Sequence, residues 1–175
     1  MHHSDEEWAR LLTDQQRFVL RDGGTEAPNS SPLARETRTG VFRCAGCGAG
    51  LFASSAKFES RTGWPTFAEP LAPKALEVGT GNSRSPWLAE AVAGARFRCA
   101  ACGSSVGERF SDGAAYPGTP AVRTGKRYCA NGAALVFESS EGGGALVVGD
   151  APGNAPLNGR RDYEWRMRDG GLRSI

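Results

Sequence analysis

Two short, nearly identical cysteine motifs constrain this 175-residue chain more than any other feature. Cys44 and Cys47 belong to the sequence Arg-Cys-Ala-Gly-Cys-Gly, and Cys99 and Cys102 belong to Arg-Cys-Ala-Ala-Cys-Gly. Each motif presents two thiols across a tight turn, which is half of the tetrahedral ligand set of structural zinc. We therefore predict a closed, non-catalytic zinc site that joins the two motifs and stabilises the fold.

The same cysteines are also compatible with other chemistry. Two redox-active Cys-x-x-Cys pairs or disulfides would use the same residues, and iron also fits a cage of four sulfurs. The duplication of the motif favours one metal shared by both pairs in a reducing compartment. Since the chain has five cysteines, this assignment leaves Cys129 as its single free thiol.

Composition narrows the class of partners. The chain has 21 lysines and arginines against 19 acidic residues, so its net charge of +2 gives no reason to expect nucleic acid as a partner. Residues 1–8 lack the basic and apolar regions of a signal peptide, and no apolar run approaches the roughly 18 residues that span a bilayer. We expect a cytoplasmic monomer that makes no contact with a membrane.

The sequence predicts two short helices followed by a β-rich body. Ser4 with Glu7, and Thr13 with Gln16, have the spacing of a capping box before apolar residues. From residue 40 onward, brief apolar stretches alternate with turns rich in Gly, Ser and Pro. This alternation is typical of short antiparallel strands.

We divide the chain into one domain of residues 1–138 and a C-terminal extension of residues 139–175. The extension is expected to be partly disordered or to add a strand, with candidate strands at residues 145–148 and 163–167. The segment before the second cysteine motif has weak periodicity, and we expect at most one helical turn there, at residues 88–92.

Cys129 lies in a predicted strand with the sequence Arg-Tyr-Cys-Ala-Asn. Because side chains alternate along a strand, Arg127, Cys129 and Asn131 are expected to point to one face. A cation beside a thiol favours the thiolate, which is the nucleophilic form. The alternative is that Cys129 is a small buried hydrophobe, as free cysteines often are.

A further motif, Gly-Trp-Pro-Thr-Phe at residues 63–67, places two aromatic side chains around a proline. Trp64 and Phe67 would form a stiff, partly apolar platform that holds a methyl-sulfur group through aromatic contacts. Alternatively, both aromatic residues belong to the core.

The order of these motifs resembles that of the methionine-R-sulfoxide reductases, the B-type methionine sulfoxide reductases. The resemblance runs from about Trp8 to Phe137. It also includes Arg-x-Gly-Gly-Thr-Glu at residues 21–26, Lys-Phe-x-Ser at residues 57–60 and Asp-Gly at residues 112–113. It implies a mainly β fold of two small antiparallel sheets with short N-terminal helices and a zinc ion far from the active site.

The resemblance also implies an activity. Cys129 would attack the R epimer of methionine sulfoxide, an acid would protonate the departing oxygen, and a sulfenic acid would remain for a thiol to reduce. Arg127 would support the thiolate and Asn131 would position polar atoms. The residues assigned to substrate binding are Trp64, Phe67, Ser105 and Phe110.

The chain departs from the family where the family has His-Leu-Gly-His-Val-Phe. Residues 105–110 have the sequence Ser-Val-Gly-Glu-Arg-Phe, and no histidine lies after residue 3. Glu108 stands in place of the second histidine, where a desolvated, neutral carboxyl group would protonate the oxygen. Alternatively, Glu108 forms an exposed ion pair with Arg109, and the acid lies elsewhere, with Asp112 as the next candidate.

Thr62 stands where many family members have a resolving cysteine. With four cysteines on the metal, Cys129 has no internal partner, so its sulfenic acid requires an external reductant. Thioredoxin, glutaredoxin or a small thiol would serve.

Three functions are compatible with the sequence. The first is a one-cysteine reductase of R-sulfoxides. The second is a reductase of a different small sulfoxide, because the missing histidines, Lys126 beside the active strand and the long C-terminal extension alter the pocket. The third is a non-enzymatic, zinc-stabilised binding module. Retention of the proposed nucleophile together with its neighbours favours an enzyme.

Overall fold

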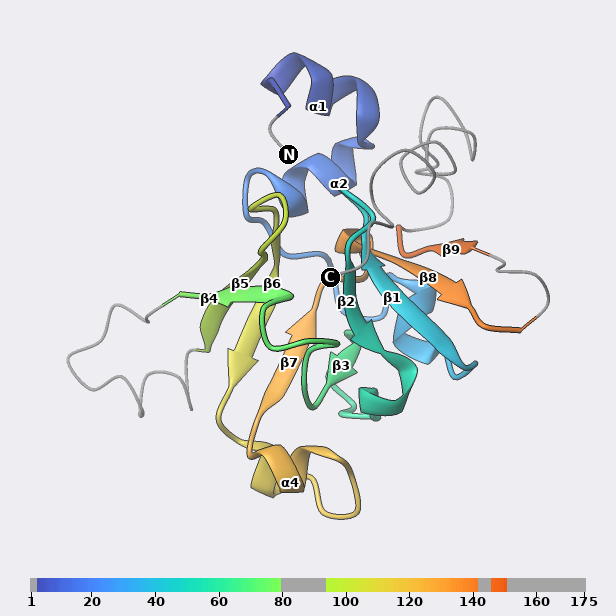
Figure 1. Ribbon diagram of the computed structural model, residues 1–175, viewed down its shortest axis with the longest axis vertical. Helices are drawn as coiled ribbons and strands as arrows, with labels where there is room; N and C mark the ends of the chain where they lie inside the picture. Colours follow the sequence, from blue (N-terminus) through green and yellow to red (C-terminus); the bar gives the residue numbers. More distant parts are fainter. Residues whose placement is uncertain (1–2, 80–93, 142–145, 151–175) are drawn as a thin grey trace.

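Two antiparallel sheets lie side by side in the computed structural model, which describes residues 3–79, 94–141 and 146–150 (Figure 1). The first sheet has the strand order β2 (Gly50–Ala53), β1 (Gly40–Cys44), β8 (Leu135–Ser139) and β9 (Leu146–Val148). The second has the order β3 (Thr66–Phe67), β7 (Arg127–Ala130), β6 (Ser105–Phe110), β5 (Ala95–Cys99) and β4 (Leu76–Val78). The predicted mainly β fold with two antiparallel sheets is confirmed.

Helices α1 (Asp5–Leu11) and α2 (Asp14–Leu20) both begin at the predicted capping boxes. The Thr13 hydroxyl accepts a hydrogen bond from the Gln16 amide at 3.0 Å, and the Gln16 side chain accepts one from the Thr13 amide at 3.2 Å. Such a cap contributes about 1 kcal/mol. Helix α2 packs against β6 and against η4 (Gly132–Ala134), the short 3-10 helix that follows β7. The N-terminal helices thus lie next to the strands that carry the candidate site.

Aromatic side chains join the two sheets in one core. Phe42 from β1 packs edge-to-face on Phe67 from β3, with ring centroids 4.9 Å apart. Phe52 from β2 stacks on the same Phe67 ring at 4.1 Å and meets Phe97 from β5 at 6.0 Å. All four of these rings are fully buried. Since aromatic pairs add about 0.5–1.5 kcal/mol each beyond their burial, this contact fixes the sheets relative to each other.

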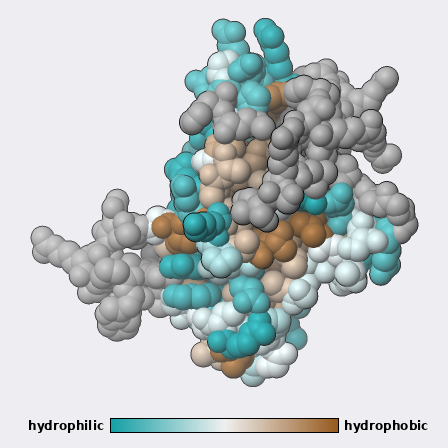
Figure 2. All heavy atoms as spheres, viewed as in Figure 1, coloured by the Kyte–Doolittle hydropathy of each residue, from teal (hydrophilic) through white to brown (hydrophobic). Residues whose placement is uncertain are grey.

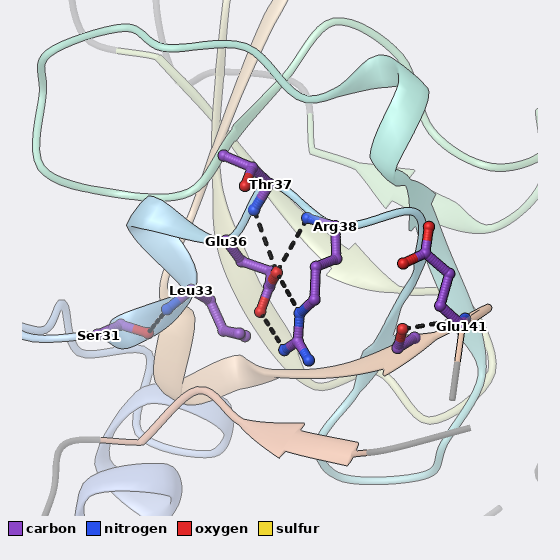
Figure 3. Close-up of polar contacts among 7 residues, drawn as sticks. Ser31, Leu33, Glu36, Thr37, Arg38 and Glu141 are labelled. Carbon is purple, nitrogen blue, oxygen red and sulfur yellow. Dashed lines mark hydrogen bonds and ion pairs between the residues drawn. The ribbon is translucent and has the colours of Figure 1, made fainter. Parts of the chain in front are cut away.

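Short helical turns connect the strands. They are η1 (Pro32–Arg35), η2 (Ser54–Ala56), η3 (Gly113–Ala115) and α4 (Ala121–Thr124). The Ser31 hydroxyl caps η1 by accepting a hydrogen bond from the Leu33 amide at 3.2 Å (Figure 3). After η1, Glu36 accepts from Arg38 Nη2 at 2.6 Å, and the backbone amide of Thr37 donates to the same carboxylate (Figure 3). These contacts fix the link between η1 and β1.

The C-terminal extension begins inside the first sheet. The predicted boundary at residue 138 falls within β8, and β9 pairs antiparallel with β8, which matches the strand expected at residues 145–148. The Gly149 amide donates to the Leu135 carbonyl at 2.9 Å, and the Thr13 hydroxyl donates to Asp150 Oδ2 at 2.6 Å. The helical turn predicted at residues 88–92 and the strand predicted at residues 163–167 lie outside the described residues.

Hydrophobic and hydrophilic residues are interspersed on the face shown in Figure 2. The large hydrophobic side chains exposed in the described part of the chain are Phe18 on α2, Leu71 after β3 and Val122 on α4. They therefore lie on separate elements of the chain. No helix among residues 3–79, 94–141 and 146–150 combines the length and the apolar character needed to cross a membrane.

Candidate active site and metal centre

The four cysteines of the two motifs converge in space. Cys44 ends β1 and Cys99 ends β5, while Cys47 and Cys102 lie in the turns that follow. All four sulfur atoms lie within 4.8 Å of one another, with Cys44 Sγ 3.8 Å from Cys102 Sγ and Cys47 Sγ 3.6 Å from Cys99 Sγ. Four sulfurs placed about 2.3 Å from a tetrahedral metal are about 3.8 Å apart. The cluster therefore has the size and the donor set of a metal site.

Glycines shape both cysteine turns. Gly48 and Gly103, which follow the second cysteine of each motif, have φ angles of 77° and 71°. Each donates its amide to the carbonyl of the first cysteine of its motif, at 2.8 Å in both turns. A residue with a Cβ atom adopts this left-handed conformation only at a cost, so the glycine belongs to the turn that aims both thiols at the metal.

The candidate active site is a cavity of about 260 Å³ over one face of the second sheet. The predicted site residues that line it are Cys129, Glu108, Arg127, Asn131, Trp64, Ser105 and Phe110. The wall also contains Gly23, Gly24, Thr25, Thr62, Arg96 and Gly107, none of which was assigned to the site from the sequence. Arg127, Cys129 and Asn131 share the cavity, whereas Tyr128 and Ala130 between them belong to the core, as the alternation of a strand requires.

The pairing of the strands places three chemically different groups in one row. Cys129 on β7 lies opposite Glu108 on β6, and Glu108 lies opposite Arg96 on β5. Directly opposed residues of antiparallel strands point to the same face, with Cβ atoms about 5 Å apart. A thiol, a carboxyl group and a guanidinium group thus follow one another across the wall of the cavity.

Burial has the largest effect on the pKa of the Cys129 thiol. Loss of solvent raises the pKa of Cys129 above its ordinary value, and the charge of Glu108 acts in the same direction. A hydrogen bond from Thr62, the charge of Arg127 and a hydrogen bond from Thr66 lower the pKa by less. Arg127 therefore lowers the pKa of Cys129, but desolvation outweighs this effect, so the pKa of the thiol is raised overall.

Arg127 is held rigidly beside the cavity. Its Nη2 donates to Asp112 Oδ2 at 2.7 Å and its Nε to Asp112 Oδ1 at 3.0 Å, and its guanidinium lies 4.1 Å from the centre of the Phe110 ring. Asp112 does not line the cavity, and its carboxylate is already engaged by the arginine. The Asp112 carboxylate therefore orients the Arg127 guanidinium group, and its role as an alternative acid stays a prediction.

Glu108 is half-buried and faces the cavity. Its chain neighbour Arg109 lies opposite Ala95 and Tyr128, which face the core side of the sheet. Because side chains alternate along β6, Glu108 and Arg109 point in opposite directions. This arrangement favours a role of Glu108 in the cavity over the predicted ion pair between the two neighbours.

Comparison with known proteins decides the family. Residues 12–139 match the model of the SelR domain. The chain belongs to the SelR domain family. It is 43% identical to the peptide methionine sulfoxide reductase MsrB of Leifsonia xyli subsp. xyli over 138 residues, which are 79% of this chain and 91% of the relative.

Two further relatives carry the same name. Identity is 41% over 140 residues with the peptide methionine sulfoxide reductase MsrB of Methanosarcina barkeri, covering 80% of this chain and 89% of the relative. Identity is 37% over 138 residues with that of Agrobacterium fabrum, covering 79% and 93% of the two chains. The resemblance to the B-type methionine sulfoxide reductases is thereby confirmed, and the family is one of oxidoreductases.

The two aromatic residues of residues 63–67 have different places in this SelR domain. Trp64 lines the cavity, and its indole Nε1 donates to the Glu26 carbonyl at 3.1 Å. Phe67 is fully buried between Phe42 and Phe52 and does not line the cavity. The structure does not bring Phe67 into the cavity, because Phe67 lies on a strand face that packs into the core, and its assignment to substrate binding stays a prediction.

Glu26 does not line the cavity but bonds to residues that do, and no role in the site was predicted for it from the sequence. It is 4% exposed, and both of its carboxyl oxygens accept backbone hydrogen bonds from η4, the turn that follows Cys129. Burial raises the pKa of Glu26 to about 7. The available signal was the motif Arg-x-Gly-Gly-Thr-Glu at residues 21–26, which carried the family resemblance without a chemical role.

Proposed function

We propose that the protein reduces the R epimer of methionine sulfoxide, in proteins or as the free amino acid, with Cys129 as its single nucleophile. One observation carries the proposal: the one cysteine outside the metal cluster faces a cavity between an indole, a carboxyl group and a guanidinium group. The relatives' name, peptide methionine sulfoxide reductase, supports the substrate class.

The reaction transfers the sulfoxide oxygen to the cysteine. The Cys129 thiolate attacks the sulfoxide sulfur and forms an S–S bond, while the oxygen takes up a proton. The oxygen then passes to the Cys129 sulfur, methionine leaves, and the enzyme holds a sulfenic acid. A first external thiol condenses with this acid to release water, and a second thiol displaces Cys129 and restores the free thiol.

The cavity residues have separable roles in this scheme. Glu108, opposite Cys129 on the neighbouring strand, takes up the proton that the Cys129 thiol loses and passes it to the sulfoxide oxygen. Arg127, held by Asp112, lowers the pKa of the thiol as the substrate arrives. The rings of Trp64 and Phe110 provide the apolar walls for the methyl-sulfur group. The buried hydroxyl of Ser105 lines the same cavity and completes the substrate-binding set.

The Asn131 side chain stabilises the backbone around the nucleophile. Its Nδ2 donates to the Val106 carbonyl at 3.1 Å, and its Oδ1 accepts from the Glu26 amide at 3.0 Å. Both polar atoms of the side chain are thus engaged with the backbone. We therefore assign Asn131 to holding β7 and β6 in register at the nucleophile.

The metal of the four-cysteine cluster is proposed to be zinc. Four thiolates with the observed spacing form a closed shell, which leaves no position for a substrate. The ion would supply stability only, since none of its ligands lines the cavity.

With its other four cysteines on the metal, the protein depends on an external reductant. We propose a thioredoxin or glutaredoxin, or a small thiol, in a reducing compartment such as the cytoplasm.

An assay of both epimers tests the proposal. Peptide-bound and free methionine sulfoxide of each configuration are incubated with the protein and dithiothreitol, and wild type is compared with Cys129→Ser. We expect reduction of the R epimer alone and no turnover by Cys129→Ser, which should retain its metal. Equal reduction of the S epimer, or activity without the cysteine, would contradict the proposal.

The same assay addresses a second candidate, a different small sulfoxide as substrate. It is favoured by the opposite charges of Arg96 and Glu108 in the cavity wall, which suit a zwitterion such as a free amino acid. Faster reduction of a small sulfoxide other than methionine sulfoxide, added to the same assay, would support this candidate.

A further inference from the structure

The carboxyl group, the backbone amide and the backbone carbonyl of Glu26 all form hydrogen bonds with residues at the candidate active site. Its carboxyl oxygens accept hydrogen bonds from the Gly132 and Ala133 amides, both at 2.7 Å. Its own amide donates to Asn131 Oδ1 at 3.0 Å, and its carbonyl accepts from Trp64 Nε1 at 3.1 Å. One residue from the N-terminal part of the chain therefore holds two cavity-lining side chains and the turn that follows the nucleophile.

That turn is packed so tightly that it has little freedom to move. A Cβ atom added to Gly132 would collide with the Ser31 hydroxyl and would lie 3.2 Å from Glu26 Oε1. A Cβ atom added to Gly149, in the segment after β9, would collide with the Gly132 carbonyl. The turn is thus clamped between Glu26 and Ser31 on one side and the C-terminal segment on the other.

The C-terminal segment also places a second carboxyl group near Glu26. Asp150 is 6% exposed, and its Oδ2 accepts from the Thr13 hydroxyl at 2.6 Å. Burial raises the pKa of Glu26 to about 7, the two amides of η4 oppose this rise, and the negative charge of Asp150 adds to it. The two η4 amides that bond to the Glu26 carboxyl group carry no charge, and Asp150 is the charged group that acts on its pKa.

We propose that Glu26 is a positioning residue for the turn after Cys129, and that Asp150 of the C-terminal segment adjusts it. An ionised Glu26 accepts both amide hydrogen bonds, whereas a protonated carboxyl group turns one acceptor into a donor that faces an N–H group. Protonation therefore weakens the hold on the turn and, through it, on Cys129. The proposal rests on the proposed function for its kinetic readout.

The test is the pH profile of kcat/KM from about pH 5 to about pH 9 for the metal-loaded wild type, Glu26→Gln and Asp150→Asn. For wild type, kcat/KM should fall as the pH is lowered, with a midpoint near the pKa of Glu26, about 7. This fall is the acidic limb of the profile. Glu26→Gln should lower kcat about tenfold or more and lack this limb. Asp150→Asn should move the limb to lower pH, because a neighbouring negative charge is gone.

Glu36→Gln is the matched control, since Glu36 forms its hydrogen bonds with Arg38 and Thr37 away from the cavity (Figure 3). It should leave the profile unchanged. An acidic limb that stays in place in both Glu26→Gln and Asp150→Asn would overturn the proposal. If Glu26→Gln does not fold, Asp150→Asn still tests the proposal, because the proposal requires this variant by itself to shift the acidic limb.

A second readout separates this proposal from the proposed function. The rate at which iodoacetamide alkylates Cys129 is measured over the same pH range, without any sulfoxide. In wild type, the pH dependence of the alkylation rate should have two inflections. One lies near pH 7 and comes from Glu26, and the other lies at higher pH and comes from the thiol itself. Glu26→Gln should lack the first of these. If the protein reduces no sulfoxide but keeps this inflection, the proposed function fails and the positioning role stands. Absence of the inflection in wild type would contradict the positioning role.

Discussion

Thr62 Oγ1 lies 3.8 Å from Cys129 Sγ, within hydrogen-bond distance for sulfur. By the family resemblance, this is the position of the resolving cysteine that many relatives carry. The side chain that touches the nucleophile is therefore an alcohol, which bonds to the sulfur but forms no disulfide. The contact places the end of the residue 62 side chain within reach of the nucleophile.

Thr62→Cys should convert the protein into a two-cysteine reductase. We expect a disulfide between the introduced thiol and Cys129 after one turnover with methionine sulfoxide, because the two side chains are already in contact. Intact mass and free-thiol titration measure this. Thr62→Ser, which keeps the hydroxyl, is the control and should accumulate a sulfenic acid, as wild type does. A persistent sulfenic acid in Thr62→Cys would show that the geometry is unsuitable.

Loss of the Arg127 charge should make Cys129 less reactive at neutral pH. Burial raises the pKa of Cys129 and Arg127 lowers it, so Arg127→Gln should raise the pKa further. At a pH below the pKa, a rise of about one in the pKa lowers the thiolate fraction about tenfold. The alkylation curve of Cys129 should move to higher pH. Arg127→Lys keeps the charge without the bidentate bond to Asp112 and should move the curve less. An unmoved curve in Arg127→Gln would rule out this electrostatic role.

Glu108→Gln should change catalysis and thiol reactivity in opposite directions. Without the proton donor, turnover should fall about 100-fold or more. The negative charge of Glu108 also raises the pKa of Cys129, so its removal should lower that pKa and speed alkylation at neutral pH. Rapid turnover by Glu108→Gln would place the acid elsewhere in the cavity.

Removal of the metal should unfold the protein. The cluster joins β1 of the first sheet to β5 of the second, and the binding energy of a structural zinc site is on the order of 10 kcal/mol. Metal analysis should find one zinc per chain, and a strong chelator or Cys99→Ser should abolish the cooperative thermal transition. Cys129→Ser is the control and should keep both. A folded protein with four free thiols and no metal would contradict the assignment.

Trp64 and Phe67 should behave differently when each is replaced by leucine. Phe67→Leu should lower the free energy of unfolding by about 1–3 kcal/mol with little change in KM, because its ring is buried in the aromatic core. Trp64→Leu should raise KM, since the indole lines the cavity. Denaturant titration and steady-state kinetics distinguish these effects. A large rise in KM for Phe67→Leu would support its predicted role in substrate binding.

Features that depend on local spacing were predictable from the sequence. The capping box at Thr13, the paired cysteine turns and the alternation around Cys129 each follow from a few neighbouring residues. The role of Glu26 was not predictable in this way, because Asn131, its partner, is 105 positions away in the chain. The burial of Phe67 in the core was not predictable, because the two-residue strand β3 gives no periodicity from which to decide its buried face. The strand expected at residues 145–148 was predictable from its apolar run, but its pairing with β8 was not, because the pairing depends on tertiary structure.

The burial of the metal ligands sets an order of oxidative damage. Cys44, Cys47 and Cys99 are buried and Cys102 is half-buried, while Cys129 faces the cavity. An excess of oxidant should therefore reach Cys102 and Cys129 before the three buried thiols. Oxidation of Cys102 would remove one ligand from the cluster that joins the two sheets, and we expect the protein to lose stability as a result. Of the four cysteines of the cluster, Cys102 is thus the one through which oxidation would first weaken the fold.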